Sequence, residues 1–134
     1  MKSESHLVKR EEIQVKKAPI KNFRDLQIWR LGNQIVLDVY KVTRAFPKEE
    51  LYGLISQTRR AAVSIPANIA EGFNRFHNKE YKQFLFIALG SCAEAETLIS
   101  LAVCLNYLSK KESAGVEELI DHEQRMIRNL IKKL

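Results

Sequence analysis

The stretch from Thr58 to Gly72 reads TRRAAVSIPANIAEG and mixes small apolar residues with an Arg pair, an Asn and a Glu. Small side chains let neighbouring backbones approach closely, so we expect this stretch in the most crowded part of the fold. Its polar groups then need partners, because an unpaired buried polar group costs roughly 1–3 kcal/mol. The stretch therefore predicts how helices pack, and we interpret its polar residues first as structural.

Apolar residues recur at every third or fourth position before and within this stretch, a pattern typical of helices. A first helix is expected to follow a cap at Asn22 or Asp25 and to end before Pro47. The second is expected from Pro47 to Gly72, with Gly72 as its C-terminal stop. A kink is expected near Pro66, because an internal proline removes a backbone hydrogen bond.

Two further helices are expected after the connection Phe73 to Asn78. The third is apolar almost all round from Tyr81 to Leu89, which implies burial on several faces or a contact between subunits. Ser109 and Glu112 have the spacing of a capping box for the fourth. Four helices with short connections predict an all-α fold, an antiparallel up-down-up-down four-helix bundle over residues 23–134.

Charge is unevenly spread along the chain, which carries a net +6. Residues 1–22 show no steady helical stripe, and we expect a basic N-terminal tail or an arm that orders against a neighbouring subunit. The polar face of the fourth helix is expected to be acidic first and basic last, as suits the helix dipole: Glu117, Glu118, Asp121 and Glu123, then Arg125, Arg128, Lys132 and Lys133.

Targeting signals and disulfides are not expected. The first residues, MKSESHLVKREE, lack the apolar core of a signal peptide, and the apolar run from Tyr81 to Leu108 is interrupted by charges, so no membrane span is predicted. Cys92 and Cys104 would lie about 18 Å apart on one helix, too far for a disulfide, and are interpreted as reduced core residues. These features predict a cytoplasmic protein.

Catalytic motifs are absent from the sequence. It contains no Glu-x-x-His pair of a di-iron bundle, no zinc-protease helix, no glycine-rich phosphate loop and no nucleophile elbow. We therefore predict no enzymatic activity, no catalytic residue, no cofactor and no metal.

Three carboxylates, Glu71, Glu94 and Glu96, interrupt otherwise apolar segments. They would suit a metal cluster, or ion pairs with Arg59 or Arg60 across a helix interface. We favour the ion pairs, because buried charges are usually paired and no His lies near enough in sequence to support a metal.

A mixed basic and aromatic patch is predicted at the connection between the second and third helices: Arg75, His77, Asn78, Lys79, Tyr81 and Lys82. That mixture suits phosphate contacts and base stacking, although a solvated loop has the same composition. Arg59 and Arg60 differ by roughly 100° around a helix, so one is expected to serve an internal pair and the other a ligand or solvent. Which of the two is buried stays open. Arg60 joins Arg75, Lys79 and Lys82 as a candidate nucleic-acid-binding residue.

The motifs RRAAVSIPANIAEG (59–72) and LGSCAEAETL (89–98) carry a family resemblance. With their surroundings over residues 22–134, they resemble the bacterial four-helix-bundle proteins encoded by intervening sequences in large-subunit ribosomal RNA genes. The resemblance implies a left-handed antiparallel bundle that assembles as a homopentamer. It does not extend to the N-terminal tail.

The family is similar in fold to the accessory protein of diversity-generating retroelements, a basic-surfaced pentamer that works with a reverse transcriptase and nucleic acid. The resemblance implies no enzymatic activity. It makes five residues the signature polar positions, which we interpret first as structural: Arg59, Arg60, Asn68, Glu71 and Glu94.

Two functional hypotheses follow. The first is a non-catalytic homo-oligomer that binds RNA or DNA with little sequence specificity, in company with a nucleic-acid-processing protein. The alternative is a structural or regulatory homo-oligomer that acts through protein–protein contacts.

Overall fold

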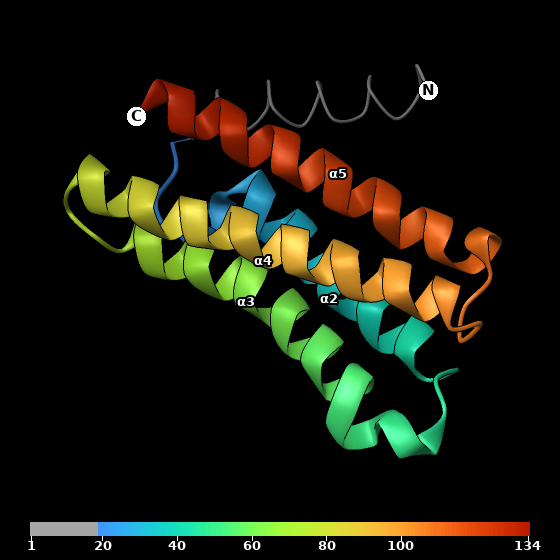
Figure 1. The fold of residues 1–134 in the computed structure, drawn as a ribbon. Coiled ribbons are helices and arrows are strands. Elements are labelled where there is room, and N and C mark those ends of the chain that lie inside the picture. Colours follow the sequence, from blue (N-terminus) through green and yellow to red (C-terminus); the bar gives the residue numbers. More distant parts are fainter. Residues whose placement is uncertain (1–18) are drawn as a thin grey trace.

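The computed structural model describes residues 19–134, which form an all-α bundle (Figure 1). This confirms the predicted fold class. The tail or arm predicted at 1–22 lies, for residues 1–18, outside the described residues. In chain order the described elements are η1 (Phe23–Asp25), α2 (Gln27–Thr43), η2 (Lys48–Glu50), η3 (Leu51–Ile55), α3 (Ser56–Phe73), α4 (Asn78–Cys104) and α5 (Lys110–Lys133).

Consecutive helices pack side by side in opposite directions. Ser64 of α3 shares a hydrogen bond of 2.8 Å with Ser91 of α4. Gly72, later in α3, lies against Phe84, earlier in α4, so these two helices are antiparallel. α5 packs against both α4 and α2, and its C-terminus lies at the end of the bundle that carries the α3–α4 loop (Figure 1). The left-handed twist implied by the resemblance stays a prediction.

The predicted helix caps are present at both ends of the bundle. Asn22 and Asp25 form a capping box, although the element that they cap is the short turn η1, and α2 begins only at Gln27. Ser109 and Glu112 form the predicted capping box of α5, with a 3.0 Å bond from the Glu112 amide to Ser109 Oγ. Each box satisfies backbone amides that the first helical turn leaves unpaired.

The predicted second helix is divided into three elements. Its backbone breaks at Gly53, whose φ of −110° and ψ of −111° are not helical, and α3 then continues through Pro66 to Phe73. Glu50 holds the break, because its Oε1 accepts a bond from the Leu54 amide and its Oε2 accepts one from the Tyr107 hydroxyl. The segment η2–η3 projects away from the other helices (Figure 1).

Gly72 serves close packing rather than the predicted helix stop. Its φ is not positive, and α3 extends one residue beyond it. A Cβ atom at Gly72 would lie 2.7 Å from Phe84 Cβ and 3.0 Å from Tyr81 Cδ1. The absence of a side chain therefore lets α4 approach α3 at this point.

The prediction that Glu123 lies on the polar face of α5 is wrong. Its side chain is fully buried, and neither carboxylate oxygen has a hydrogen-bond partner within residues 19–134. It faces α2, since a Cβ atom at Gly32 would lie 3.0 Å from Glu123 Oε2. Burial raises the pKa of Glu123 well above its ordinary value, because the charged form is poorly solvated in the core.

Helix α4 combines a buried stripe with an exposed apolar one. It is long and apolar enough to cross a membrane by length and composition, and it is the one such helix among residues 19–134. In the bundle, however, it packs against α3 and α5, as a core helix does. Cys92 is buried in it, but Cys104 is exposed, so only one of the two predicted core cysteines is in the core.

Candidate nucleic-acid interface

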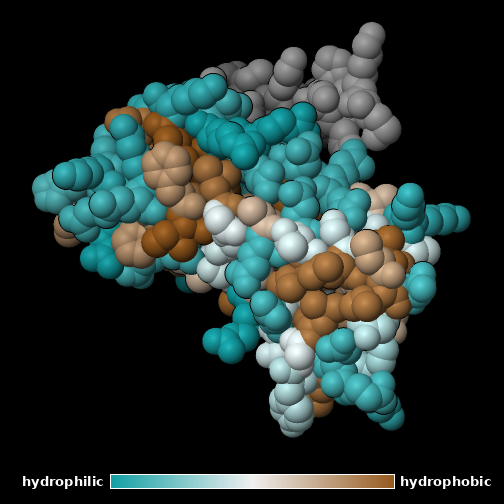
Figure 2. Space-filling view, viewed as in Figure 1, coloured by the Kyte–Doolittle hydropathy of each residue, from teal (hydrophilic) through white to brown (hydrophobic). Residues whose placement is uncertain are grey.

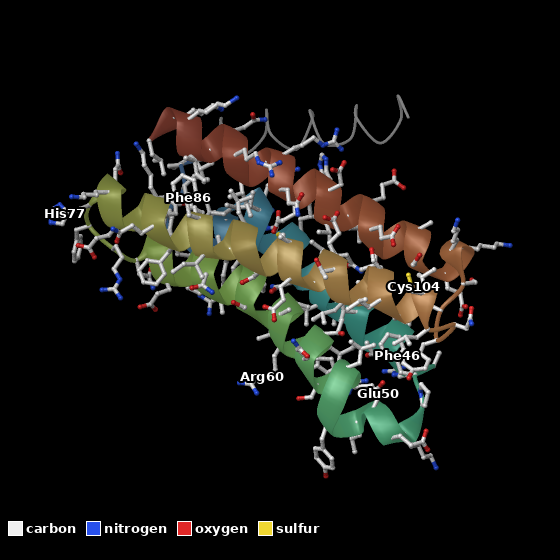
Figure 3. The ribbon with its side chains drawn as sticks, in the orientation of Figure 1. Phe46, Glu50, Arg60, His77, Phe86 and Cys104 are labelled. Atoms are coloured by element: carbon white, nitrogen blue, oxygen red, sulfur yellow. The ribbon has the colours of Figure 1, made fainter. Side chains whose placement is uncertain are left out.

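The α3–α4 loop extends into solvent from the well-packed ends of the two helices that it joins. Phe73, the last residue of α3, packs edge-on against Tyr81, with ring centroids 6.0 Å apart. The Arg75 amide donates to the Gly72 carbonyl at 3.1 Å, which closes the end of α3. With the close approach at Gly72, these contacts leave residues 74–77 facing outward, and His77 lies at the outer tip (Figure 3).

Arg75 is held by the protein itself. Its Nη2 lies 2.7 Å from Glu71 Oε1 and its Nη1 lies 3.8 Å from Glu80 Oε2. The guanidinium group also lies over the Phe84 ring, 5.0 Å from its centroid. These two carboxylates offset its charge, so Arg75 is a weaker phosphate ligand than its position in the sequence indicates.

The two lysines of the predicted patch have no such partners. Lys79 is exposed and Lys82 is half-buried, and neither forms an ion pair within the described part of the chain. They are three residues apart on α4, which places them on the same side of its first turns. Both amines are therefore available to an anionic partner.

The aromatic residue of the patch is Phe76 rather than Tyr81. Tyr81 is buried, and burial raises the pKa of its hydroxyl to about 12. Phe76 is 99% exposed. The spacing of Tyr81, Leu85 and Ala88 places Tyr81 on the buried stripe of α4, and this signal could have excluded it from a surface patch.

Positive charge gathers at the end of the bundle that carries this loop. Gly32 lies close to Pro66 and to Glu123, and these contacts mark the middle of the bundle. The half with the loop (residues 19–32, 66–91 and 123–134) contains ten Lys and Arg against four Asp and Glu. The other half (33–65 and 92–122) contains seven against nine. The fold thus makes one end basic and the other slightly acidic.

Arg60 does not belong to the loop group. It lies thirteen residues before the end of α3, or about 20 Å along the helix axis from the loop. It is exposed and lines an open pocket of about 530 Å³ together with Tyr52, Ser64 and Glu94. Figure 3 shows its side chain pointing away from the bundle. The predicted set of four basic residues is therefore divided between two places.

The signature polar residues Arg59 and Asn68 act inside the fold. Arg59 is half-buried, donates from Nε to Thr43 Oγ1 at 2.9 Å, and lies 4.5 Å from the centroid of the Tyr40 ring. Asn68 Nδ2 donates to both the carbonyl and the hydroxyl of Ser64, at 2.8 Å each. Arg59 thus joins α3 to α2, and Asn68 supports the serine bond between α3 and α4.

The ion pairs predicted between the carboxylates and the Arg59–Arg60 pair are not formed. Glu71 pairs with Arg75 instead, four residues away on the surface. Glu94 is exposed, lines the pocket beside Arg60, and has no ion pair within residues 19–134. The described residues contain no group of three or more His, Cys, Asp or Glu that could hold a metal ion. The four predicted members of a structural polar cluster are spread over separate contacts.

Glu123 is the polar residue that sequence reasoning misplaced most. Val116, Ile120, Glu123 and Ile127 follow one another at spacings of four, three and four, and all are buried. This spacing places Glu123 on the apolar stripe of α5. The charge of the residue, rather than its position, led to the exposed assignment.

Comparisons with known proteins agree with this fold. A family model described as 23S rRNA-intervening sequence protein matches residues 24–129. The chain is similar to the crystal structure of a protein with unknown function from the S23 ribosomal protein family of Bacteroides thetaiotaomicron, with a TM-score of 0.71. That alignment has 18% sequence identity and covers 78% of this chain and 98% of the other. A search of curated proteins finds no match.

Proposed function

The chain belongs to the 23S rRNA-intervening sequence protein family, and from this premise we propose that it is a non-catalytic, homo-oligomeric bundle protein that binds nucleic acid. It takes RNA or DNA at the basic end of the bundle with little sequence specificity. It acts in the bacterial cytoplasm without a cofactor, as a homopentamer, and works beside a nucleic-acid-processing protein.

The observation that carries this proposal is the separation of charge along the bundle. Ten basic residues gather in the half that presents Lys79 and Lys82, while the other half has a small acidic excess. A polyanion that approaches the basic end releases condensed counterions, and this release drives binding that does not depend on sequence. Repeating the chain in an oligomer multiplies the effect.

The test is a titration of the full chain against fluorescently labelled RNA and DNA at several salt concentrations. We expect log K to fall linearly with log salt, by about 0.7 for each phosphate contacted on a single strand. The double variant Lys79→Glu/Lys82→Glu should weaken binding and reduce this slope.

The matched control is Lys110→Glu/Lys111→Glu, which makes the same change of charge in the acidic half. It should bind nearly as the wild type does. Absence of binding by the wild type at low salt would contradict the proposal. Equal losses of affinity in the two double variants would contradict the assignment of the binding site to the loop end.

The second candidate function is a structural or regulatory homo-oligomer that acts through protein contacts. It is favoured by apolar side chains left exposed on α2, on α4 and just after α4: Leu37 is 64% exposed, Phe86 57%, Leu105 52%, Ile87 50% and Leu101 46%. Figure 2 shows apolar areas gathered in two places on the face in view. Exposed apolar patches commonly mark protein interfaces.

Sedimentation velocity tests the oligomer that both candidates require, and the titration against RNA and DNA then separates the two. We expect an oligomer that Ile87→Asp or Leu101→Asp disrupts, because each change places a charge on an apolar face. Circular dichroism would check that each variant remains helical. A stable oligomer that binds no RNA or DNA at low salt would support the second function over the first.

A further inference from the structure

We propose that the α3–α4 loop stacks an unpaired base on Phe76, so that the partner of the basic end is a single-stranded nucleic acid. Lys79 and Lys82 contact the phosphates beside that base. This inference rests on the proposed function and deepens it, since it names the form of nucleic acid that is bound.

The exposure of Phe76 has no explanation within the bundle. The neighbouring aromatic residues of this region use the apolar surface that is present: Phe73 packs against Tyr81, and Phe84 lies beneath Arg75. Phe76 packs against none of them and is 99% exposed. Burial of an aromatic ring is favourable, so a ring left in water at the tip of a loop is free to bind a partner.

The cations beside Phe76 indicate what that partner is. Lys79 follows it by three residues and Lys82 by six, and neither amine is paired within residues 19–134. An exposed ring beside unpaired cations is the combination that single-strand binding proteins use, with bases stacked on the ring and phosphates held by the cations. An apolar protein partner would have to leave these charges unpaired or supply carboxylates against the basic end.

A duplex does not fit the ring. The faces of paired bases are covered by their neighbours in the stack, whereas an unpaired base offers a free face to an aromatic side chain. Phosphate contacts alone would serve single strands and duplexes alike. Phe76 is therefore the residue that should distinguish the two forms.

The experiment measures Kd of the full chain for an RNA of about 20 nucleotides, for its duplex, and for the DNA strand of the same sequence. We expect the single strands to bind more tightly than the duplex. Phe76→Ala and Phe76→Leu should each weaken single-strand binding roughly fivefold or more and leave duplex binding unchanged. Phe76→Trp should retain binding, and RNA should quench the fluorescence of the added Trp. The comparison of the RNA strand with the DNA strand shows whether the ribose matters.

The matched control is Tyr52→Ala, which removes a ring that is 94% exposed in the other half of the bundle. It should leave all affinities unchanged. Phe76→Leu separates stacking from simple apolar contact, because Leu keeps an apolar side chain without a π face.

The possible failures are distinguishable. If the wild type binds no nucleic acid at low salt, the proposed function fails. If it binds but Phe76→Ala changes nothing, or if duplex and single strand bind equally, this inference is overturned and the proposed function stands. If Phe76→Ala dissociates the oligomer while the affinity for RNA is kept, Phe76 is a protein contact and the inference is also overturned.

Discussion

Glu123 and Phe76 lie in opposite environments, and each is the reverse of what its chemistry favours. Glu123 is fully buried in the middle of the bundle without a hydrogen-bond partner in residues 19–134. Phe76 is 99% exposed at the tip of the α3–α4 loop. Glu123 lies on the buried stripe of α5 and Phe76 lies in the loop between α3 and α4, so the position in the fold, rather than the hydropathy of the side chain, decided both placements. The core should therefore respond strongly to small changes at Glu123, and the loop should tolerate large ones at Phe76.

The largest expected effect is the dependence of stability on pH through Glu123. Because burial raises its folded-state pKa, the native protein keeps this proton at pH values where the unfolded chain, with an ordinary pKa of about 4.3, has lost it. The stabilisation is complete below about pH 4.3 and falls by about 1.4 kcal/mol per pH unit until the folded-state pKa is reached. Urea unfolding at a series of pH values measures this slope.

The comparison variant for this prediction is Glu123→Gln, which keeps the size of the side chain and removes its ionisation. The slope of its unfolding free energy against pH should lack the Glu123 contribution. At alkaline pH the variant should be more stable than the wild type. Gly32, which faces Glu123, does not titrate, and burial raises the pKa of the Cys92 thiol, which senses the Glu123 charge, to about 12. If the unfolding free energies of the two proteins changed with pH in parallel, Glu123 would not be buried without a partner.

The next effect concerns the packing that supports the loop. Gly72→Ala places a Cβ atom 2.7 Å from Phe84 Cβ, so α3 and α4 must move apart. We expect a loss of about 1–3 kcal/mol in the free energy of unfolding, which exceeds the gain of roughly 1 kcal/mol in helix propensity.

The control is Gly115→Ala in α5, where no atom lies within 4 Å of the added Cβ. This change should stabilise the protein by about 0.5–1 kcal/mol. If Gly72→Ala stabilised the protein as much as Gly115→Ala, the close approach of α3 and α4 at Gly72 would be contradicted.

A smaller loss of stability is expected from Gly32→Ala, which changes the residue that faces Glu123. The new Cβ atom would lie 3.0 Å from Glu123 Oε2 and 3.3 Å from Pro66 Cβ, tight contacts that allow more adjustment than those of Gly72. We expect a loss of about 1 kcal/mol in unfolding free energy. In a double-mutant cycle with Glu123→Ala the two changes should couple, since the shorter side chain vacates the space. Strict additivity would contradict the contact.

The smallest effect on stability is expected at Phe76, in the α3–α4 loop. Phe76→Ala should change the free energy of unfolding by less than about 0.5 kcal/mol, because a fully exposed side chain loses no packing. The same urea titration measures it. A loss comparable to that of Gly72→Ala would mean that Phe76 is buried in the assembled protein.

Local patterns carried the prediction of the helices. The spacing of apolar residues located four α-helices, and the capping residues Ser109 and Glu112 located the start of α5 correctly. The break at Gly53 was not predicted. Glu50 accepts a bond from the nearby Leu54 amide, but its second bond comes from Tyr107, 57 residues away, and local patterns do not indicate that contact.

The sequence by itself determined the helices, most of their ends, the bundle and the family, because helix periodicity, capping and proline act over a few neighbouring residues. Only the tertiary structure decided which polar groups meet. It placed Arg59 on Thr43, buried Glu123 against Gly32, and brought the basic residues of distant segments to one end. Such contacts depend on how the helices are rotated and aligned against one another, and that arrangement is set by packing across the whole core.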